Sequence, residues 1–253
     1  MARVVAPALQ ALLGGIIDYA GSFPPASLSY EEAYRNFQAY KRGTHRSLLS
    51  RFVISSRDLD QMPSGSDGPF SVLANDDHPR ADTIESKSLV HTSKPLYWEC
   101  ALNELEAAKR AGVFAKIRTG GIEPAAIPSV DEVAEFILCC TGLHLAFKAT
   151  AGLHHPIRAS HPLTYEGRAP RAIMHGFINL FLAAAFAWSG QLNILPVLSE
   201  TDPCAFRFDE QAHWRDWSLT TGQVNDARHN FAHSFGSCSF TEPIDSLQEL
   251  GLL

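Results

Sequence analysis

The segments VFAKIRTGG at residues 113–121 and LHLAFKATAGLHHPIR at residues 143–158 decide how the rest of the chain is interpreted. Each segment contains a short apolar run that is typical of a buried strand, and each has one lysine near the end of that run, Lys116 or Lys148. Between them, the motif SVDE that begins at Ser129 forms a capping box and predicts a helix. The stretch therefore predicts a strand–helix–strand unit with a lysine at the end of each strand.

Segments typical of strands alternate with segments typical of helices along the whole chain, which predicts parallel strands joined by helical crossovers. The eight predicted strands are Leu13–Tyr19, Ser50–Ser55, Phe70–Ala74, Ala81–Lys87, Leu96–Ala101, the two lysine strands and Asn193–Ser199. Eight strands in 253 residues favour an α/β fold of the (β/α)8 TIM-barrel type in which some helices are short or missing. An open doubly wound sheet is the alternative, but the chain has no G-x-G-x-x-G or G-x-x-x-x-G-K motif.

Residues 1–253 are predicted to form a single domain, because no linker long enough to divide the chain is present. Residues 203–253 are expected as a C-terminal extension packed on the barrel, with a hairpin over 205–219 followed by a helix over 221–234. The segment Ala172–Trp188 predicts a helix that is apolar on every side, and such a helix is buried in the protein or in an interface between subunits. A homo-oligomer is therefore considered.

Charge and cysteine content limit the partners and the compartment. The chain has 21 Lys and Arg against 27 Asp and Glu, a formal net charge of −6, and no basic run, which argues against a nucleic acid partner. Five cysteines without a C-x-x-C pair favour reduced thiols in the cytoplasm over a disulfide framework. The N-terminal segment has one basic residue, Arg3, and the apolar stretches are too short or too polar to span a bilayer, so we expect neither export nor a membrane partner.

In such a barrel, the side chains at the carboxyl ends of the strands form the active site. The alternation of side chains along a strand places Lys116 on one face with Arg118, and Lys148 on one face with Thr150. Burial of a lysine next to a second cation lowers its pKa, and a neutral amine can form a Schiff base with a carbonyl compound. We therefore predict catalytic roles for four residues, Lys116, Lys148, Glu99 and Asp18.

In this scheme one lysine is the nucleophile and the other cation lowers its pKa, while Glu99 or Asp18 moves protons and Tyr97 is an alternative donor. Two other interpretations stay open: a structural salt bridge between Lys116 and Glu99, and binding of an anionic substrate group by Lys148. The residues predicted to bind a small anionic carbonyl or carboxylate substrate are Arg118, Thr119, Thr150, Tyr97, Arg57, His154 and His155. The scheme requires no metal and no cofactor.

These motifs resemble class I deoxyribose-phosphate aldolases and their relatives over about forty residues. The matching residues are Lys116 with Thr119 and Gly120, in the pattern Lys-x-x-Thr-Gly, and Lys148 with Gly152, in the pattern Lys-Ala-x-x-Gly. The resemblance implies a (β/α)8 barrel in which the lysine of strand six forms the Schiff base and the lysine of strand seven assists.

The sequence also departs from that family. Arg118 stands where the family has a small residue, and LHHP at residues 153–156 replaces its glycine-rich segment after strand seven. No counterpart of the family's strand-four aspartate is identified, and the predicted strand eight is not followed by a phosphate-binding turn of small residues. Deoxyribose phosphate is therefore not the expected substrate.

Two other classes of function remain as alternatives. Histidines in the loop after strand seven and in the tail, together with carboxylates, would suit a metal-dependent hydrolase or lyase, although no H-x-H or H-E-x-x-H motif is present. The third class is a non-catalytic barrel that binds an anion or another ligand. In the segment SFGSCSF at residues 234–240, Cys238 would be a nucleophile if a base lies near it, but we expect a tight turn that packs the tail.

Overall fold

The computed structural model describes residues 5–253, so the prediction that concerns Arg3 lies outside the described residues. Within this range, eight parallel strands form a closed barrel in the order β1-β13-β7-β6-β5-β4-β3-β2, which confirms the predicted TIM-type barrel. Its strands are β1 Ile17–Tyr19, β2 Leu49–Ser55, β3 Phe70–Leu73, β4 Thr83–Ser86, β5 Leu96–Glu99, β6 Phe114–Arg118, β7 Phe147–Thr150 and β13 Ala232–Ser237.

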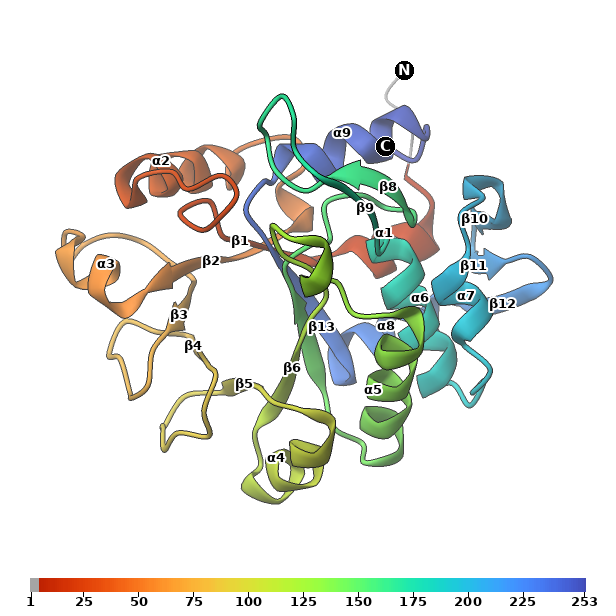
Figure 1. Ribbon diagram of the computed structural model, residues 1–253, viewed down its shortest axis with the longest axis horizontal. Helices are drawn as coiled ribbons and strands as arrows, with labels where there is room; N and C mark the ends of the chain where they lie inside the picture. Colours follow the sequence, from red (N-terminus) through yellow and green to blue (C-terminus); the bar gives the residue numbers. More distant parts are fainter. Residues whose placement is uncertain (1–4) are drawn as a thin grey trace.

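Helices surround the barrel unevenly. They are α1 Pro7–Leu13, α2 Tyr30–Tyr40, α3 Ser56–Gln61, α4 Leu105–Ala111, α5 Val130–Gly142, α6 Phe177–Trp188, α7 Leu195–Ser199, α8 Thr221–Asn230 and α9 Thr241–Glu249, with short 3-10 turns at Arg46–Leu48, Leu102–Glu104, Pro124–Ala126 and Pro203–Ala205. In the described chain no helix joins β3 to β4 or β4 to β5, as the short connections predicted. Figure 1 shows α2 and α3 on one side of the barrel, with α5, α6 and α8 on the opposite side.

The predicted eighth strand was wrong. Residues Leu195–Ser199 form the helix α7, because Pro196 supplies the fixed φ that suits the first helical turn and has no N–H to offer a strand. The barrel is closed instead by β13, which pairs with β1 and β7 and begins inside the helix predicted over 221–234. The expected C-terminal extension therefore contains a strand of the barrel itself.

The N-terminal boundary of the first strand was also predicted too early. Residues Pro7–Leu13 form α1, and a turn at Gly14 and Gly15 separates this helix from β1. Gly15 has φ +56°, a conformation that glycine adopts without the steric cost that other residues meet.

The predicted apolar helix is buried inside this chain. Every residue of α6 from Phe177 to Ala187 is buried, and the rings of Phe177 and Phe181 lie 5.3 and 5.9 Å from that of Phe235 on β13. Its expected first residues instead form β9 (Arg171–Met174), which pairs with β8 (Ala159–Pro162) in a two-stranded sheet after β7. No helix in residues 5–253 combines the length and the apolar character needed to cross a membrane.

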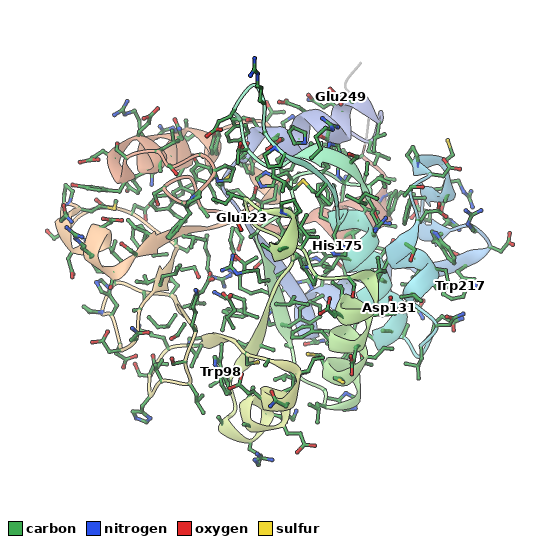
Figure 2. The ribbon with its side chains drawn as sticks, in the orientation of Figure 1. Trp98, Glu123, Asp131, His175, Trp217 and Glu249 are labelled. Carbon is green, nitrogen blue, oxygen red and sulfur yellow. The ribbon has the colours of Figure 1, made fainter. Side chains whose placement is uncertain are left out.

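The predicted hairpin near the C-terminus is confirmed as part of a three-stranded antiparallel sheet, formed by β10 Phe206–Phe208, β11 Gln211–Trp214 and β12 Trp217–Thr220. The rings of Trp214 and Trp217 pack edge to face at 5.1 Å. Figure 1 shows this sheet at the edge of the molecule, beyond α7, and Figure 2 labels Trp217 in the same region.

Candidate active site

A chain of alternating charges crosses the interior of the barrel. Side chains on parallel strands that face inward at the same level meet near the barrel axis, so residues far apart in the sequence become neighbours. In order of contact the members of this charge chain are Asp18 on β1, Lys148 on β7, Glu85 on β4, Lys116 on β6, Glu99 on β5 and Arg118 on β6.

Lys148 is a fixed cation within this chain. Its Nζ lies 2.5 Å from Oδ2 of Asp18 and 2.6 Å from Oε1 of Glu85, and its side chain is 1% exposed. Burial acts to lower the pKa of Lys148, but the two carboxylates outweigh it and hold the pKa above the ordinary value for lysine. The expectation of a depressed pKa is therefore wrong for Lys148.

Asp18 is equally enclosed. Its Oδ2 accepts a hydrogen bond from Oγ of Ser234 at 2.6 Å, and its Oδ1 accepts one from the backbone N–H of Arg51 at 3.1 Å. Together with Lys148, these donors give both carboxylate oxygens a partner, so that Asp18 anchors the lysine.

Glu85 joins the two lysines. Its Oε1 accepts hydrogen bonds from Lys148 and from Oγ of Ser71, while its Oε2 lies 3.1 Å from Nζ of Lys116. Burial acts to raise the pKa of Glu85, but Lys148 and Lys116 hold it well below its ordinary value, so the side chain is a carboxylate. Glu85 therefore provides the counter-charge that the two lysines share.

Glu85 was not among the predicted catalytic residues. The available signal was the alternation in the segment TIES, which puts Thr83 and Glu85 on one face of β4. In the structure both side chains face inward. Oγ1 of Thr83 donates to Oγ of Ser71 at 2.9 Å, and Oγ of Ser71 donates to Oε1 of Glu85.

Lys116 faces a cavity of about 880 Å³ at the carboxyl ends of the strands. Its Nζ is 3.1 Å from Oε2 of Glu99 as well as 3.1 Å from Glu85, and its side chain is buried. Lys116, Glu85 and Glu99 line the cavity, whereas Lys148 and Asp18 lie outside its lining. Of the two predicted lysines, Lys116 is thus the one that a small molecule in this cavity would meet.

Arg118 holds the other side of Glu99. Its Nε and Nη2 lie 2.8 and 3.2 Å from the two carboxylate oxygens, in the paired arrangement that a planar guanidinium favours. Burial acts to raise the pKa of Glu99, but Arg118 and then Lys116 lower it below the ordinary value. The predicted salt bridge between Lys116 and Glu99 is present, as one link of this longer chain.

Two glycines let the cavity-forming loops approach closely. A Cβ on Gly120 would lie 2.7 Å from Cα of Gly152, and a Cβ on Gly152 would lie 2.8 Å from Cα of Gly120. Gly152 also has φ +76°. Both motif glycines therefore have a physical reason: they allow the turn after β6 to pack against the turn after β7, where a side chain would not fit.

The other predicted substrate-binding residues are distributed unevenly. Thr150 and His154 line the cavity with Arg118, while His155 lines a second cavity of about 800 Å³ and stacks on His161. Thr119 is buried, and its Oγ1 donates to the carbonyl oxygen of Ala151 at 2.6 Å.

Tyr97 and Arg57 lie away from the cavity lining. The hydroxyl of Tyr97 lies 2.8 Å from Nδ1 of His233, on the side of the barrel nearer the strand N-termini. Burial raises the pKa of Tyr97 to about 12. Arg57 is exposed on α3. The structure therefore does not bring these two side chains to Lys116.

The histidines do not assemble as the metal alternative requires. Within residues 5–253, no group of three or more His, Cys, Asp or Glu is arranged to hold a metal ion. His229 and His233 both fall in the helix predicted over 221–234, but α8 ends at Asn230 and His233 belongs to β13.

Comparisons with known proteins add no further constraint. No family model, no curated protein and no solved structure matches the chain. The candidate site is therefore interpreted from its own geometry.

Proposed function

We propose that the protein is a barrel lyase that acts on a small carbonyl compound through a Schiff base at Lys116. The observation that carries the proposal is that Lys116 lines the cavity while sharing the carboxylate of Glu85 with a second lysine, Lys148. Their positions on β6 and β7 agree with the roles that the aldolase resemblance implies.

The cluster around Lys116 contains one more cation than carboxylates. Arg51 also approaches Asp18, with 4.0 Å between Nη1 and Oδ1. Within the described chain the cations of the cluster are Lys116, Lys148, Arg118 and Arg51, and its carboxylates are Asp18, Glu85 and Glu99.

In the proposed reaction, Lys116 transfers a proton to Glu99 and its neutral amine attacks the carbonyl carbon of the substrate. The carbonyl oxygen takes one proton from the attacking amine and one from Glu99 and leaves as water, so that an iminium ion remains and Glu99 is again a carboxylate. Glu99 then accepts the proton of a hydroxyl group on the β-carbon, the bond between the α- and β-carbons breaks, and its electrons form an enamine. Protonation and hydrolysis of the enamine release the second product and restore Lys116.

The cavity suits a small anionic substrate. Its volume of about 880 Å³ is in the range of small-molecule sites, and Arg118 and Lys87 lie on its lining in addition to Lys116. Arg118 is about half exposed even though it holds Glu99, so part of the guanidinium remains open to a ligand.

Borohydride trapping tests the proposal directly. The protein is incubated with a panel of small aldehydes and keto acids, reduced with borohydride and mapped by mass spectrometry. We expect at least one compound to leave a reduced adduct on Lys116, and we expect none in Lys116→Arg, which keeps a cation but removes the amine.

Lys87 provides an internal control, because it is an exposed lysine on the lining of the same cavity. Adducts on Lys87 to the same extent as on Lys116 would mean non-specific modification. If no compound modifies Lys116 beyond that level, the Schiff-base proposal fails. Retained ligand binding without any adduct would then favour a non-catalytic barrel.

A further inference from the structure

Cys238 and His154 on the lining of the cavity, with Glu242 on the lining of the second cavity, form an arrangement that the Schiff base does not use. Sγ of Cys238 lies 4.0 Å from Nε2 of His154, and Nδ1 of His154 lies 2.8 Å from Oε2 of Glu242. Cys238 follows β13, His154 follows β7, and Glu242 lies in the first turn of α9. The three side chains thus form a chain of contacts that contains a nucleophile, a base beside it and a group that orients the base.

The surroundings favour the charged forms of both the thiol and the imidazole. Burial acts to raise the pKa of Cys238, but the hydrogen bond and the charge of His154 outweigh it and lower the pKa. Burial acts to lower the pKa of His154, but Cys238 and Glu242 raise it to about 9. By contrast, burial raises the pKa of Cys100 to about 11 and also raises the pKa of Cys140. Cys238 and His154 therefore each favour the charged form of the other.

Small molecules that enter the cavity reach this pair. Cys238 is only 6% exposed, yet it and His154 both line the cavity. The lining of the cavity also contains the apolar side chains of Phe23, Leu163 and Met174. The thiol is thus enclosed with a small substrate and sheltered from bulk water and large molecules.

We propose that Cys238 is a second nucleophile of the cavity and accepts an acyl group from a small ester or thioester. Acyl transfer requires a nucleophile and, on the same side, a proton donor for the leaving group, and Sγ with Nε2 of His154 provides both. The proposal does not rest on Lys116 or on a Schiff base.

The steps balance with water as the only other reactant. The thiolate of Cys238 attacks the carbonyl carbon, a C–S bond forms, and the carbonyl electron pair moves to oxygen. The intermediate collapses and expels the alcohol or thiol, which takes a proton from His154. Neutral His154 then removes a proton from water, the hydroxide attacks the acyl–enzyme, and a carboxylic acid leaves while Cys238 returns to its thiolate form.

The test uses p-nitrophenyl acetate as the acyl donor and the full-length protein. We expect a burst of about one p-nitrophenolate per chain, with one acetyl group mapped by mass spectrometry to Cys238. Cys238→Ser is expected to abolish this acetylation, and His154→Gln to slow it by roughly 100- to 10,000-fold. Cys204→Ser, at an exposed cysteine, serves as the control and is expected to leave the burst unchanged.

Glu242 acts through His154 and is tested as a positioning residue. In Glu242→Gln, acetylation is expected to require a higher pH, because His154 loses the carboxylate that favours its charged form and Cys238 then loses its cationic partner. A role in folding alone would change the melting temperature without moving this pH profile.

Two results would overturn the inference. One is acetylation that is spread over Cys204 and other cysteines at rates similar to that of Cys238. The other is a Cys238 that iodoacetamide alkylates readily at neutral pH but that no ester acylates, which would mean a reactive thiol without acyl-transfer activity. Because the mapped residue is Cys238, neither result depends on whether Lys116 forms a Schiff base.

Discussion

Lys116 and Lys148 are register partners on the neighbouring strands β6 and β7, and their ammonium groups contact opposite oxygens of one carboxylate. That carboxylate, Glu85, therefore separates two like charges that strand geometry brings close together. Lys148 has a second anchor in Asp18, whereas Lys116 has Glu99 at the cavity. The same pair of residues thus provides one cation enclosed in the barrel, Lys148, and one that lines the cavity, Lys116.

Glu85→Gln is predicted to destabilise the fold strongly. The substitution leaves two buried lysines without their shared counter-charge, and breaking a buried ion pair from one side costs about 3–5 kcal/mol. The free energy of unfolding from urea titration is the measurement. Glu123→Gln is the matched control, since Glu123 lines the same cavity but is exposed on the loop after β6 (Figure 2), and a change within about 0.5 kcal/mol is expected there. Equal stability of the two variants would contradict this account of Glu85.

Gly152→Ala is predicted to destabilise the protein by about 1–3 kcal/mol and to weaken ligand binding in the cavity. The new Cβ would lie 2.8 Å from Cα of Gly120, and φ +76° is unfavourable for alanine. Gly167→Ala is the control, because its Cβ would have no neighbour within 4 Å. Thermal melts of the two variants give the comparison, and a Gly152→Ala protein as stable as Gly167→Ala would show that the two turns can move apart.

Apolar patterning predicted the barrel and both lysine strands, but it could not find the strand that closes the barrel. The segment AHSFGS of β13 is polar on its inner face, where Ser234 donates to Asp18, and Phe235 on its outer face packs against α6. Serine and glycine are typical of turns, so the local composition predicted a turn instead of a strand. The inner face of this strand is polar because it contacts the charge cluster. That contact depends on the tertiary structure and cannot be inferred from the local sequence.

The two parts of the site differed in how well they could be predicted from the sequence. Lys116 and Lys148 lie on adjacent strands of one local unit, so their proximity followed from the predicted topology. Cys238, His154 and Glu242 come from separate loops and a helix, and the prediction that Cys238 lies in a packing turn did not include its base. Only the closure of the barrel by β13 beside β7 brings the loop of His154 to Cys238.

Arg228→Met is predicted to lower the free energy of unfolding by about 2–4 kcal/mol. The buried guanidinium donates to the carbonyl oxygens of Leu12 and Ala232 and, at 3.2 Å, to that of Gly14, so it ties α1 to α8 and β13. Methionine fills similar space but leaves these acceptors unsatisfied, at a cost of about 1–3 kcal/mol for each that water cannot reach. Arg110→Met, at an exposed position on α4, is the control in urea titrations. A loss no larger than that of Arg110→Met would mean that the carbonyl groups find other donors.

His233→Gln is predicted to make the protein less sensitive to acid. Burial, followed by the charge of Arg228, lowers the pKa of His233 to about 4 in the folded protein. The unfolded chain binds a proton near pH 6.5, so between pH 6.5 and 4 the unfolded state holds one more proton and stability falls as the pH falls. Over this window the wild type should lose roughly 3 kcal/mol of unfolding free energy that His233→Gln retains, since one pKa unit corresponds to about 1.4 kcal/mol.

Glutamine is chosen as the substitution because it can still form a hydrogen bond with the hydroxyl of Tyr97. Urea titrations at pH 7 and pH 4 measure the difference, with His229→Gln at an exposed position as the control. Parallel loss of stability in His233→Gln and wild type would show that His233 is protonated in the folded state.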